Sequence, residues 1–215
     1  MNCANPFLVA SLLLCGVPSP GLSLKSEPPC VPITIGLDLS QAGNSAGVLF
    51  GDSPGQTFFA ADTLLRSLTA WRVASQANNG FGIHLFITET DSTGRPDNLR
   101  IVFDGPTIVR TDGDGINPTP FHWYFDPPVS LPAPGTYAFF LSPAQCFAFC
   151  DVLSSGGRDL YAAGNLWGSG RGCALGGYPH PVYGADLIFQ IEFCSTDTPT
   201  PTQSRSWGSL KGIYR

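Results

Sequence analysis

Short segments in which apolar and polar residues alternate constrain the fold of this chain more than any other feature. The clearest lies at residues 81–88, where every second residue is apolar: Phe81, Ile83, Leu85 and Ile87. Gly and Pro, 25 and 20 of the 215 residues, separate such segments with turn signals. Further strands are predicted at residues 33–39, 45–50, 56–60, 64–73, 99–103, 107–110, 121–125, 135–141, 147–153 and 186–193. About ten short strands predict an all-β, antiparallel β-sandwich or jelly roll, with a closed barrel as the alternative.

One segment also fits a helix. Leu64, Leu65 and Leu68 have helical spacing within residues 61–70. Trp71 and Val73 continue the segment with residue types that favour strands. We therefore predict a strand there, and a helix is the competing interpretation.

The charge balance limits the partners. The net charge is −5, only 13% of residues are charged, and Lys25 and Lys211 are the only lysines. Without a basic patch, counterion release cannot drive binding to nucleic acid, and anionic membrane surfaces are disfavoured for the same reason. Neutral polymers such as glycans, cell-surface proteins and cations remain as partners.

The first residues resemble a secretory signal peptide. Residues 7–17 are apolar and are followed by Pro18, Pro20 and small residues. We predict a signal peptide at residues 1–23, cleaved after Ser23, and a secreted, extracellular or cell-surface location. No other segment approaches the roughly 20 apolar residues of a transmembrane helix.

The cysteines predict disulfides. Removing the signal peptide removes Cys3 and Cys15 of the seven cysteines and leaves five. An oxidising compartment favours two bridges and one free thiol over a zinc site, which is the lesser alternative. Cys30 and Cys194 bracket the predicted domain, so a bridge between them joins its first and last strands. The remaining three are Cys146, Cys150 and Cys173, and Cys173 is expected to pair with either of the other two.

The domain boundaries follow from composition. The β-sandwich domain covers residues 30–194, and a Thr/Pro-rich linker covers residues 195–204. Residues 205–215 form a tail in which Trp207, Leu210 and Tyr214 share one face of a short helix. Such a helix needs a partner to be ordered, and a frayed tail is the alternative.

Five further motifs recur along the predicted strands and turns: Gln56-Thr-Phe-Phe-Ala60, Leu68-Thr-Ala-Trp71, Phe86-Ile-Thr-Glu-Thr-Asp-Ser-Thr-Gly-Arg-Pro96, Leu131-Pro-Ala-Pro-Gly-Thr-Tyr-Ala-Phe-Phe-Leu141 and Asp186-Leu-Ile-Phe189. Together they resemble a broad group of bacterial extracellular β-sandwich modules of largely uncharacterised function. The resemblance covers residues 56–194 and implies a sandwich fold. For function it implies carbohydrate binding or a spacer role. The chain departs from the pattern in its extra cysteines and in having no attached enzyme.

The C-terminal tail carries a second resemblance. Trp207-Gly-Ser-Leu-Lys-Gly-Ile-Tyr-Arg215, after the Thr/Pro-rich linker, is similar to short C-terminal tags on secreted proteins of some uncultured bacteria. This resemblance implies a sorting signal or surface attachment.

Two turns are rich in oxygen ligands. Asp112-Gly-Asp-Gly-Ile-Asn117 offers Asp112, Asp114 and Asn117 to Ca²⁺, but it lacks the downstream bidentate Glu of a complete calcium loop. The alternative is a plain polar turn. The second turn is explained by Asp-x-x-Gly-x-Pro geometry alone, and it contains Glu89, Asp91, Asp97 and Asn98. Ca²⁺ is the one candidate cofactor.

Exposed aromatic residues favour a sugar ligand, because sugar rings stack on flat side chains without charge. The Gly-rich segment 164–184 lacks strand character and contains the predicted ligand contacts Asn165, Trp167, Tyr178 and Tyr183. It is either a binding loop or a disulfide-pinned cover over the core. Trp71 and Trp123 lie within predicted strands and are assigned to the core.

No catalytic motif is evident. His84, His122 and His180 are scattered, and neither a phosphate loop nor a dinucleotide-binding fingerprint occurs. We therefore predict a secreted, non-catalytic module for adhesion, carbohydrate binding or surface display. A carbohydrate-active hydrolase and a structural envelope component are the alternatives.

Overall fold

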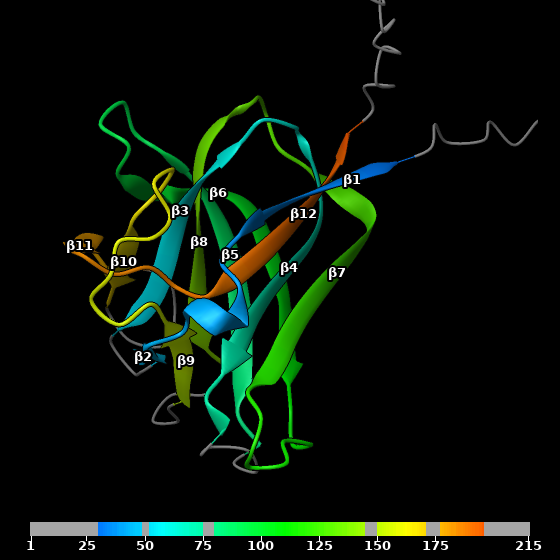
Figure 1. Cartoon of the computed structure of the whole chain (residues 1–215). Coiled ribbons are helices and arrows are strands. Elements are labelled where there is room, and N and C mark those ends of the chain that lie inside the picture. Colours follow the sequence, from blue (N-terminus) through cyan, green and yellow to red (C-terminus); the bar gives the residue numbers. More distant parts are fainter. Residues whose placement is uncertain (1–29, 49–51, 75–79, 145–149, 171–176, 196–215) are drawn as a thin grey trace, which may run out of the picture.

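The computed structural model describes residues 30–48, 52–74, 80–144, 150–170 and 177–195. Within these ranges the chain forms twelve strands and one short 3-10 helix, η1 (Leu39–Gln41), in two antiparallel sheets (Figure 1). The strands are β1 (Val31–Gly36), β2 (Asn44–Val48), β3 (Ser53–Ala60), β4 (Leu64–Arg72), β5 (Gly82–Thr90), β6 (Pro96–Val109), β7 (Thr119–Ser130), β8 (Gly135–Pro143), β9 (Cys150–Ser154), β10 (Leu166–Ser169), β11 (His180–Val182) and β12 (Phe189–Ser195). The prediction of an all-β sandwich is confirmed.

The two sheets mix strands from distant parts of the chain. In the first sheet the order is β1-β12-β4-β9-β2, with β7 paired to β4, and in the second it is β11-β10-β3-β8-β5-β6. Every pairing is antiparallel. Within the described ranges, no helix is both long and apolar enough to cross a membrane.

The core lies between the inner faces of the two sheets. Alternating residues of β5 supply Ile83, Leu85 and Ile87, each fully buried, as the sequence predicts. The first sheet contributes Trp123 and Phe189 from the opposite side. Trp123, 1% exposed, lies in this core, and Trp71, 8% exposed, is buried in a second cluster with Leu37 and Ile188, so the prediction that both are buried is confirmed.

Strand β4 shows why its sequence also fits a helix. The register of β4 against β7 shifts between Leu65 and Ser67, which marks a β-bulge. The bulge turns Leu65 and Leu68, three positions apart, into the same core, where both are fully buried. The helical spacing therefore arises from a bulged strand, and the strand prediction is confirmed.

Strand β6 is longer than predicted. Gly105 and Pro106 look like a break between two strands, but β6 runs through them. Pro106 fits because β6 lies at the edge of the second sheet, and its carbonyl accepts a hydrogen bond from Trp123 Nε1 at 2.9 Å. The prediction of two strands at residues 99–103 and 107–110 was wrong.

Two short strands were not predicted at all. Segment 164–184 contains β10 and β11, which pair with each other, and β10 also pairs with β3. The strand predicted at residues 56–60 also starts earlier than expected, since Ser53 to Gly55 belong to β3 and pair with β10. Strands of four and three residues are too short to show alternation.

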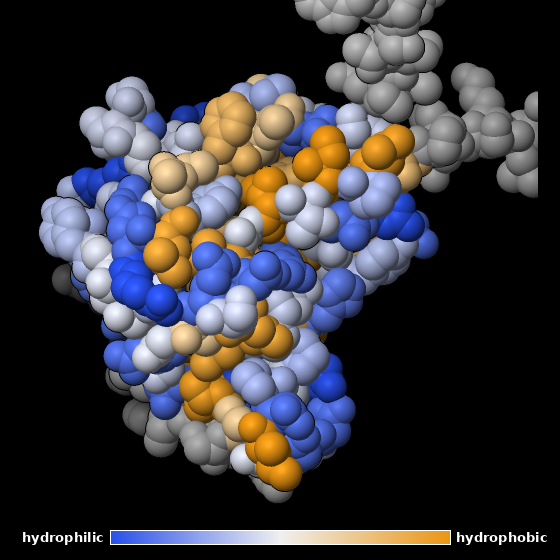
Figure 2. Space-filling model, viewed as in Figure 1, coloured by the Kyte–Doolittle hydropathy of each residue, from blue (hydrophilic) through white to orange (hydrophobic). Residues whose placement is uncertain are grey.

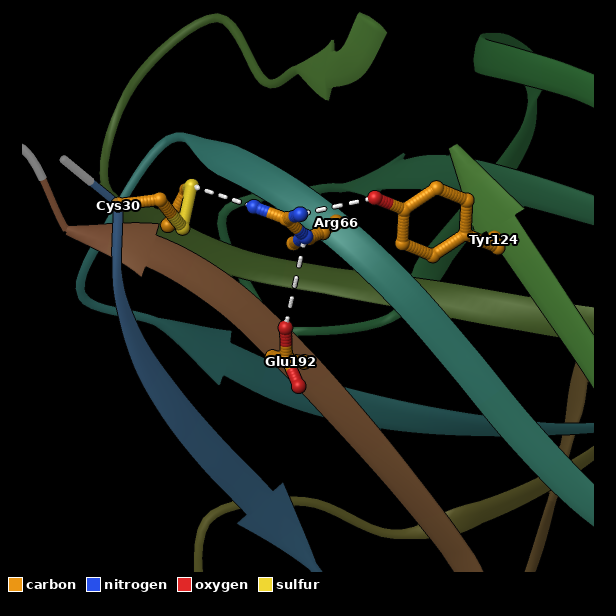
Figure 3. The surroundings of a disulfide bond; sticks show 5 residues. Cys30, Arg66, Tyr124 and Glu192 are labelled. Carbon is orange, nitrogen blue, oxygen red and sulfur yellow. Dashed lines mark hydrogen bonds and ion pairs between the residues drawn. A yellow bond between two sulfur atoms is a disulfide. The ribbon is translucent and has the colours of Figure 1, made fainter. Parts of the chain in front are cut away.

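A disulfide closes the domain. Cys30 and Cys194, 164 positions apart, are bonded, and they join the beginning of β1 to the end of β12 (Figure 3). Around the bond, Arg66 lies 3.7 Å from Glu192 Oε1 and donates to Tyr124 Oη at 2.8 Å. The bridge reinforces the pairing of the first and last strands. In that pairing Val31 lies opposite Ser195 at one end, and Gly36 lies opposite Gln190 at the other.

Strand β1 is an edge strand of the first sheet with apolar residues on its surface. Val31 and Ile33 are 41% and 40% exposed, and Figure 2 shows apolar surface at this end of the molecule. Because the side chains of β1 are mostly exposed, the strand is held to the domain mainly by its pairing with β12 and by the disulfide.

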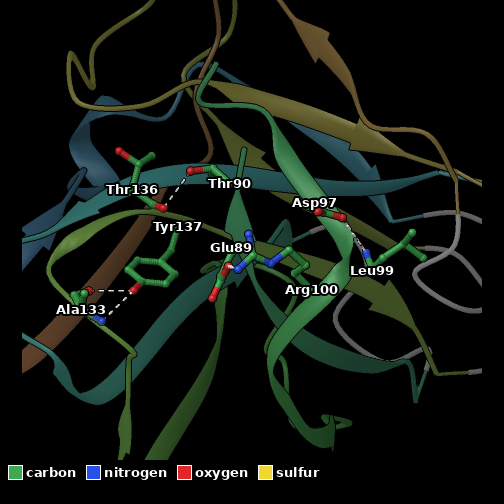
Figure 4. A network of polar contacts seen from close by, with 8 residues as sticks. All are labelled: Glu89, Thr90, Asp97, Leu99, Arg100, Ala133, Thr136 and Tyr137. Atoms are coloured by element: carbon green, nitrogen blue, oxygen red, sulfur yellow. Dashed lines mark hydrogen bonds and ion pairs between the residues drawn. The ribbon is translucent and has the colours of Figure 1, made fainter. Parts of the chain in front are cut away.

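Two of the motifs behind the family resemblance have local structural roles. Asp91 Oδ1 accepts hydrogen bonds from the main-chain N–H of Thr93 and of Arg95, and Gly94 takes a positive φ of 81° in that turn. Tyr137 donates its hydroxyl to the carbonyl of Ala133 at 2.7 Å and accepts from the N–H of the same residue (Figure 4). Both motifs therefore fix turns, so they carry information on fold and none on ligand.

Candidate functional site

Two of the predicted ligand contacts share a groove. A cavity of about 410 Å³, here called the β2–β10 groove, lies where the edge strand β2 of the first sheet meets β10 and β11 of the second. Its lining includes both Trp167 and Tyr183. The other lining residues are Asn44, Ser45, Ala46, Gly47, Asp52, Pro54, Ser154, Gly156, Gly157, Leu166, Gly168, Val182 and Ala185.

Strand pairing positions the two aromatic residues. Trp167 lies opposite Gly55 of β3 and opposite Pro181 of β11. Tyr183 follows the last residue of β11 and is 88% exposed, so its ring is free to meet a ligand. The half-buried Trp167 and the exposed Tyr183 are 16 positions apart in sequence and reach the same groove through the β10–β11 pairing.

Asp52 is the unexpected member of the groove. It precedes β3, is half-buried, and its Oδ1 is buried with no hydrogen-bond donor within the described part of the chain. Burial raises the pKa of this carboxyl above its ordinary value of 3.8, and His180 offsets part of that rise. No sequence pattern singles out Asp52, because an isolated acid carries no signal that marks it as functional.

Gly168 makes this arrangement feasible. A Cβ at position 168 would lie 2.9 Å from Asp52 Oδ1 and closer still to the ring of His180. Any larger residue would displace one of these two side chains. Nearby, Trp167 Nε1 is buried and has no acceptor among the described residues. Two polar atoms of the lining therefore lack the partners that buried groups normally have.

Tyr178 lies elsewhere. It is 75% exposed and borders a separate cavity of about 430 Å³ with Asp91, Pro96, Leu99 and Pro179. The guanidinium of Arg95 lies over its ring, 3.3 Å from the centroid, and donates to its hydroxyl. Tyr178 therefore does not share a cavity with Trp167 and Tyr183.

Asn165 has a structural contact. Its main-chain N–H donates to Thr57 Oγ1 at 2.8 Å, and its carbonyl accepts from the N–H of Thr57 at 3.0 Å. Its side chain is not part of the groove lining.

The turn with the predicted calcium ligands is internally bonded. Arg110 binds both carboxylate oxygens of Asp112, at 2.7 and 2.6 Å. Asp114 accepts from the N–H groups of Ile116 and Asn117 and from the amide of Asn117, which lowers its pKa to about 2. No group of three or more His, Cys, Asp or Glu side chains suited to a metal occurs within the described ranges. Ca²⁺ binding by this turn stays a prediction.

The second oxygen-rich turn is also occupied by internal contacts. Glu89 forms an ion pair with Arg100, and Asp97 accepts from the N–H of Leu99 at 3.0 Å (Figure 4). Asn98 is buried and its amide donates to Ser169 Oγ and to the carbonyl of Gly177. These bonds tie the start of β6 to the segment after β10.

The histidines have different surroundings. His84 lies between Thr107, 2.9 Å from Nδ1, and Asp104, 2.6 Å from Nε2. Because the Asp104 side chain is 68% exposed, water screens its charge, and this is a polar cross-strand contact on the surface. His122 contacts Thr69 Oγ1 at 2.7 Å.

The remaining cysteines are only partly described. Cys150 is a free, fully buried thiol, so the predicted alternative in which Cys173 pairs with Cys150 is wrong. Burial is the main cause that raises the pKa of this thiol, to about 12. Ser195, the first residue of the predicted linker, belongs to β12. Cys146, Cys173, residues 196–204 of the linker and the tail lie outside the described residues.

Comparison with known proteins adds no identification. No protein-family model matches the chain, and no curated protein sequence matches it either.

Proposed function

We propose that this chain is an exported, non-catalytic β-sandwich that binds carbohydrate in the β2–β10 groove. The observation behind this proposal is that Trp167 and Tyr183 line one groove of about 410 Å³. Ligand sites in proteins are concave, largely apolar and supplied with a few polar groups. Two aromatic rings beside Asp52, Asn44 and Ser45 match that description.

The charge of the groove supports a sugar over an anionic ligand. None of its described lining residues is Lys or Arg, and Asp52 is its one carboxyl group. The whole chain has a net charge of −5. Phosphates, nucleic acid and acidic polymers would therefore meet repulsion without compensating donors.

Export is part of the proposal. The Cys30–Cys194 bond supports it, because disulfides form in oxidising compartments and are rare in the cytosol. We assign residues 1–23 to a signal peptide and residues 205–215 to a sorting or attachment tag, on their sequence resemblance. We also propose a bacterial extracellular origin, on the family resemblance alone.

A hydrolase acting on the same sugars is the main alternative. Paired-carboxylate hydrolysis of a glycosidic bond needs two acids roughly 5–10 Å apart. Among the described residues that line the groove, Asp52 is the only acid. This favours binding without cleavage, and release of reducing sugar from a bound polysaccharide would contradict it. A purely structural envelope role would leave the groove without a ligand.

A glycan array with four proteins tests the proposal. They are the wild type, Trp167→Ala, Tyr183→Ala and Tyr178→Ala. We expect the wild type to bind a defined set of glycans and the first two variants to lose at least about tenfold in affinity, equivalent to roughly 1.4 kcal/mol. Tyr178→Ala removes an exposed aromatic ring outside the groove and serves as the control.

Fold integrity is controlled within the same set. Tyr183 is 88% exposed, so its replacement leaves the core intact even if Trp167→Ala destabilises the sheet edge. Binding of no glycan by the wild type contradicts the proposal. Equal binding by all four proteins contradicts the placement of the ligand in the groove.

A further inference from the structure

The described residues that line the β2–β10 groove include one acidic side chain and no basic one. Asp52 contributes a carboxyl group, while none of the described lining residues supplies a cationic side chain. Its Oδ1 is buried and receives no hydrogen bond within the described part of the chain. A carboxylate taken out of water without donors is costly, and a ligand that brings a donor removes that cost.

The protein offers little compensation of its own at this position. His180 packs against the same Gly168 backbone and opposes the effect of burial on Asp52 only in part. By contrast, Asp186, which is fully buried near these strands, accepts hydrogen bonds from Gln56, Leu160 and Tyr161. Asp186 is therefore a structural carboxylate, whereas the carboxylate of Asp52 is left to interact with a ligand.

The aromatic residues beside Asp52 favour the same kind of ligand group. Trp167 and Tyr183 line the groove with it. Aromatic faces attract cations, Trp most strongly, and the attraction grows when the cation is desolvated. A charged donor also forms a stronger hydrogen bond to a carboxylate than a neutral hydroxyl does, by roughly twofold.

We infer that the groove selects a saccharide that carries a protonated amino group, with Asp52 accepting the ammonium and Trp167 and Tyr183 packing on the sugar. The inference rests on the proposed carbohydrate-binding function and names its ligand class. Asp52 is thereby a specificity-determining residue. A neutral sugar would donate a hydroxyl to Asp52 and lose the charge attraction.

Calorimetric titration with three oligosaccharides of equal length tests the inference. The probes are a β-1,4-linked glucosamine oligomer, its N-acetylated counterpart and the corresponding glucose oligomer. At mildly acidic to neutral pH we expect the amino oligomer to bind at least about tenfold more tightly than the other two. Acetylation removes the charge but keeps the sugar ring, so it isolates the contribution of the ammonium.

Two variants assign the preference to Asp52. Asp52→Asn keeps the shape and removes the charge, and it should bring the three affinities to within about twofold of one another. Asp159→Asn removes the same charge from an exposed position outside the groove lining, so it should keep the wild-type preference. Circular dichroism and thermal unfolding establish that each variant is folded.

The outcomes separate this inference from the proposed function. Equal binding of the amino and neutral oligomers by the wild type overturns the inference and leaves carbohydrate binding intact. A preference that survives in Asp52→Asn also overturns it, because another group must then hold the amine. If the glycan array shows no binding at all, the proposed function fails and the inference fails with it.

Discussion

Gln56 and Asp186 lie 130 positions apart and meet in the buried interior, where Gln56 Nε2 donates to Asp186 Oδ1 at 2.9 Å. Both side chains are fully buried. Gln56 Oε1 accepts from the N–H of Leu187 at 3.0 Å, and Asp186 Oδ2 accepts from the N–H groups of Leu160 and Tyr161. The pair therefore connects β3 with the segments before β10 and β12. Two of the motifs that carry the family resemblance, Gln-x-Phe and Asp-Leu-x-Phe, are the two halves of this contact.

Removing Asp186 should destabilise the fold strongly. Asp186→Ala leaves the buried Gln56 amide and the partly buried main-chain N–H groups of Leu160 and Tyr161 without acceptors, so we expect a loss of about 3–5 kcal/mol in the free energy of unfolding. Urea denaturation followed by tryptophan fluorescence measures it. Asp159→Asn, at an exposed position, should change stability by less than about 0.5 kcal/mol.

A double-mutant cycle with Gln56→Met checks that the loss belongs to the pair. The free energy of unfolding lost by the combined variant should be smaller than the sum of the two single losses, by about 1–2 kcal/mol. The reason is that each single change leaves the other side chain buried without its hydrogen-bond partner. Strict additivity would show that the two side chains act independently.

Opening the Cys30–Cys194 bond should also lower stability. The bond closes a loop of 164 positions, and the chain-entropy relation gives about 5 kcal/mol for a loop of this length. We expect Cys30→Ser combined with Cys194→Ser to approach that loss in denaturant unfolding. A change below about 1 kcal/mol would mean that the unfolded chain gains little freedom when the ends are released.

Cys150 should resist modification and make stability depend on alkaline pH. Burial raises the pKa of its thiol from 9.0 to about 12, so the unfolded state releases this proton first as the pH rises. The raised pKa therefore favours unfolding between these two values, with a slope of up to about 1.4 kcal/mol per pH unit. Peptide mapping after iodoacetamide treatment should find Cys150 unmodified in the native protein.

The difference between wild type and Cys150→Ala isolates this titration, because all other groups titrate in both proteins. The stability of the wild type should fall relative to the variant above pH 9. Parallel pH profiles, or rapid alkylation of native Cys150, would contradict the burial of this thiol.

The Asp52 carboxylate should lower the stability of the folded protein while it favours binding of the ligand. Its pKa is raised in the folded state, so the folded protein holds the proton more tightly and loses stability relative to the unfolded chain as the pH rises above 3.8. Asp52→Asn removes this cost, and we expect its unfolding midpoint at pH 7 to be higher than that of the wild type. At pH 3 the advantage should shrink. An Asp52→Asn variant that is less stable than wild type at pH 7 would indicate a structural role for the carboxylate.

Parts of the fold were predictable because they depend on local residue order. The alternation in β5 identifies both the strand and its buried face, since neighbouring side chains of a strand point in opposite directions. The aromatic residues of β7, Phe121, Trp123 and Phe125, follow the same rule. In β4 and β6 the local signal was distorted by a bulge and by Gly105-Pro106, and only pairing with neighbouring strands identifies their true course.

The groove was less predictable. Trp167 and Tyr183 were selected as exposed aromatic residues in a Gly-rich segment, and the same reasoning selected Tyr178, which lies in another cavity. Asp52 was not selected, because its significance arises from burial beside Gly168 and His180. No property of the acid itself distinguishes it from the exposed acids of the chain.

The sequence by itself determined that this is an all-β protein and which faces of its main strands are buried, because alternation acts over a few residues. It also indicated that Cys30 and Cys194 lie at the two ends of one domain. Only the tertiary structure decided that Asp52, Trp167 and Tyr183 share a groove and that Gln56 meets Asp186. These relationships depend on which strands become neighbours across more than 100 residues, and that choice is made by the packing of the whole core.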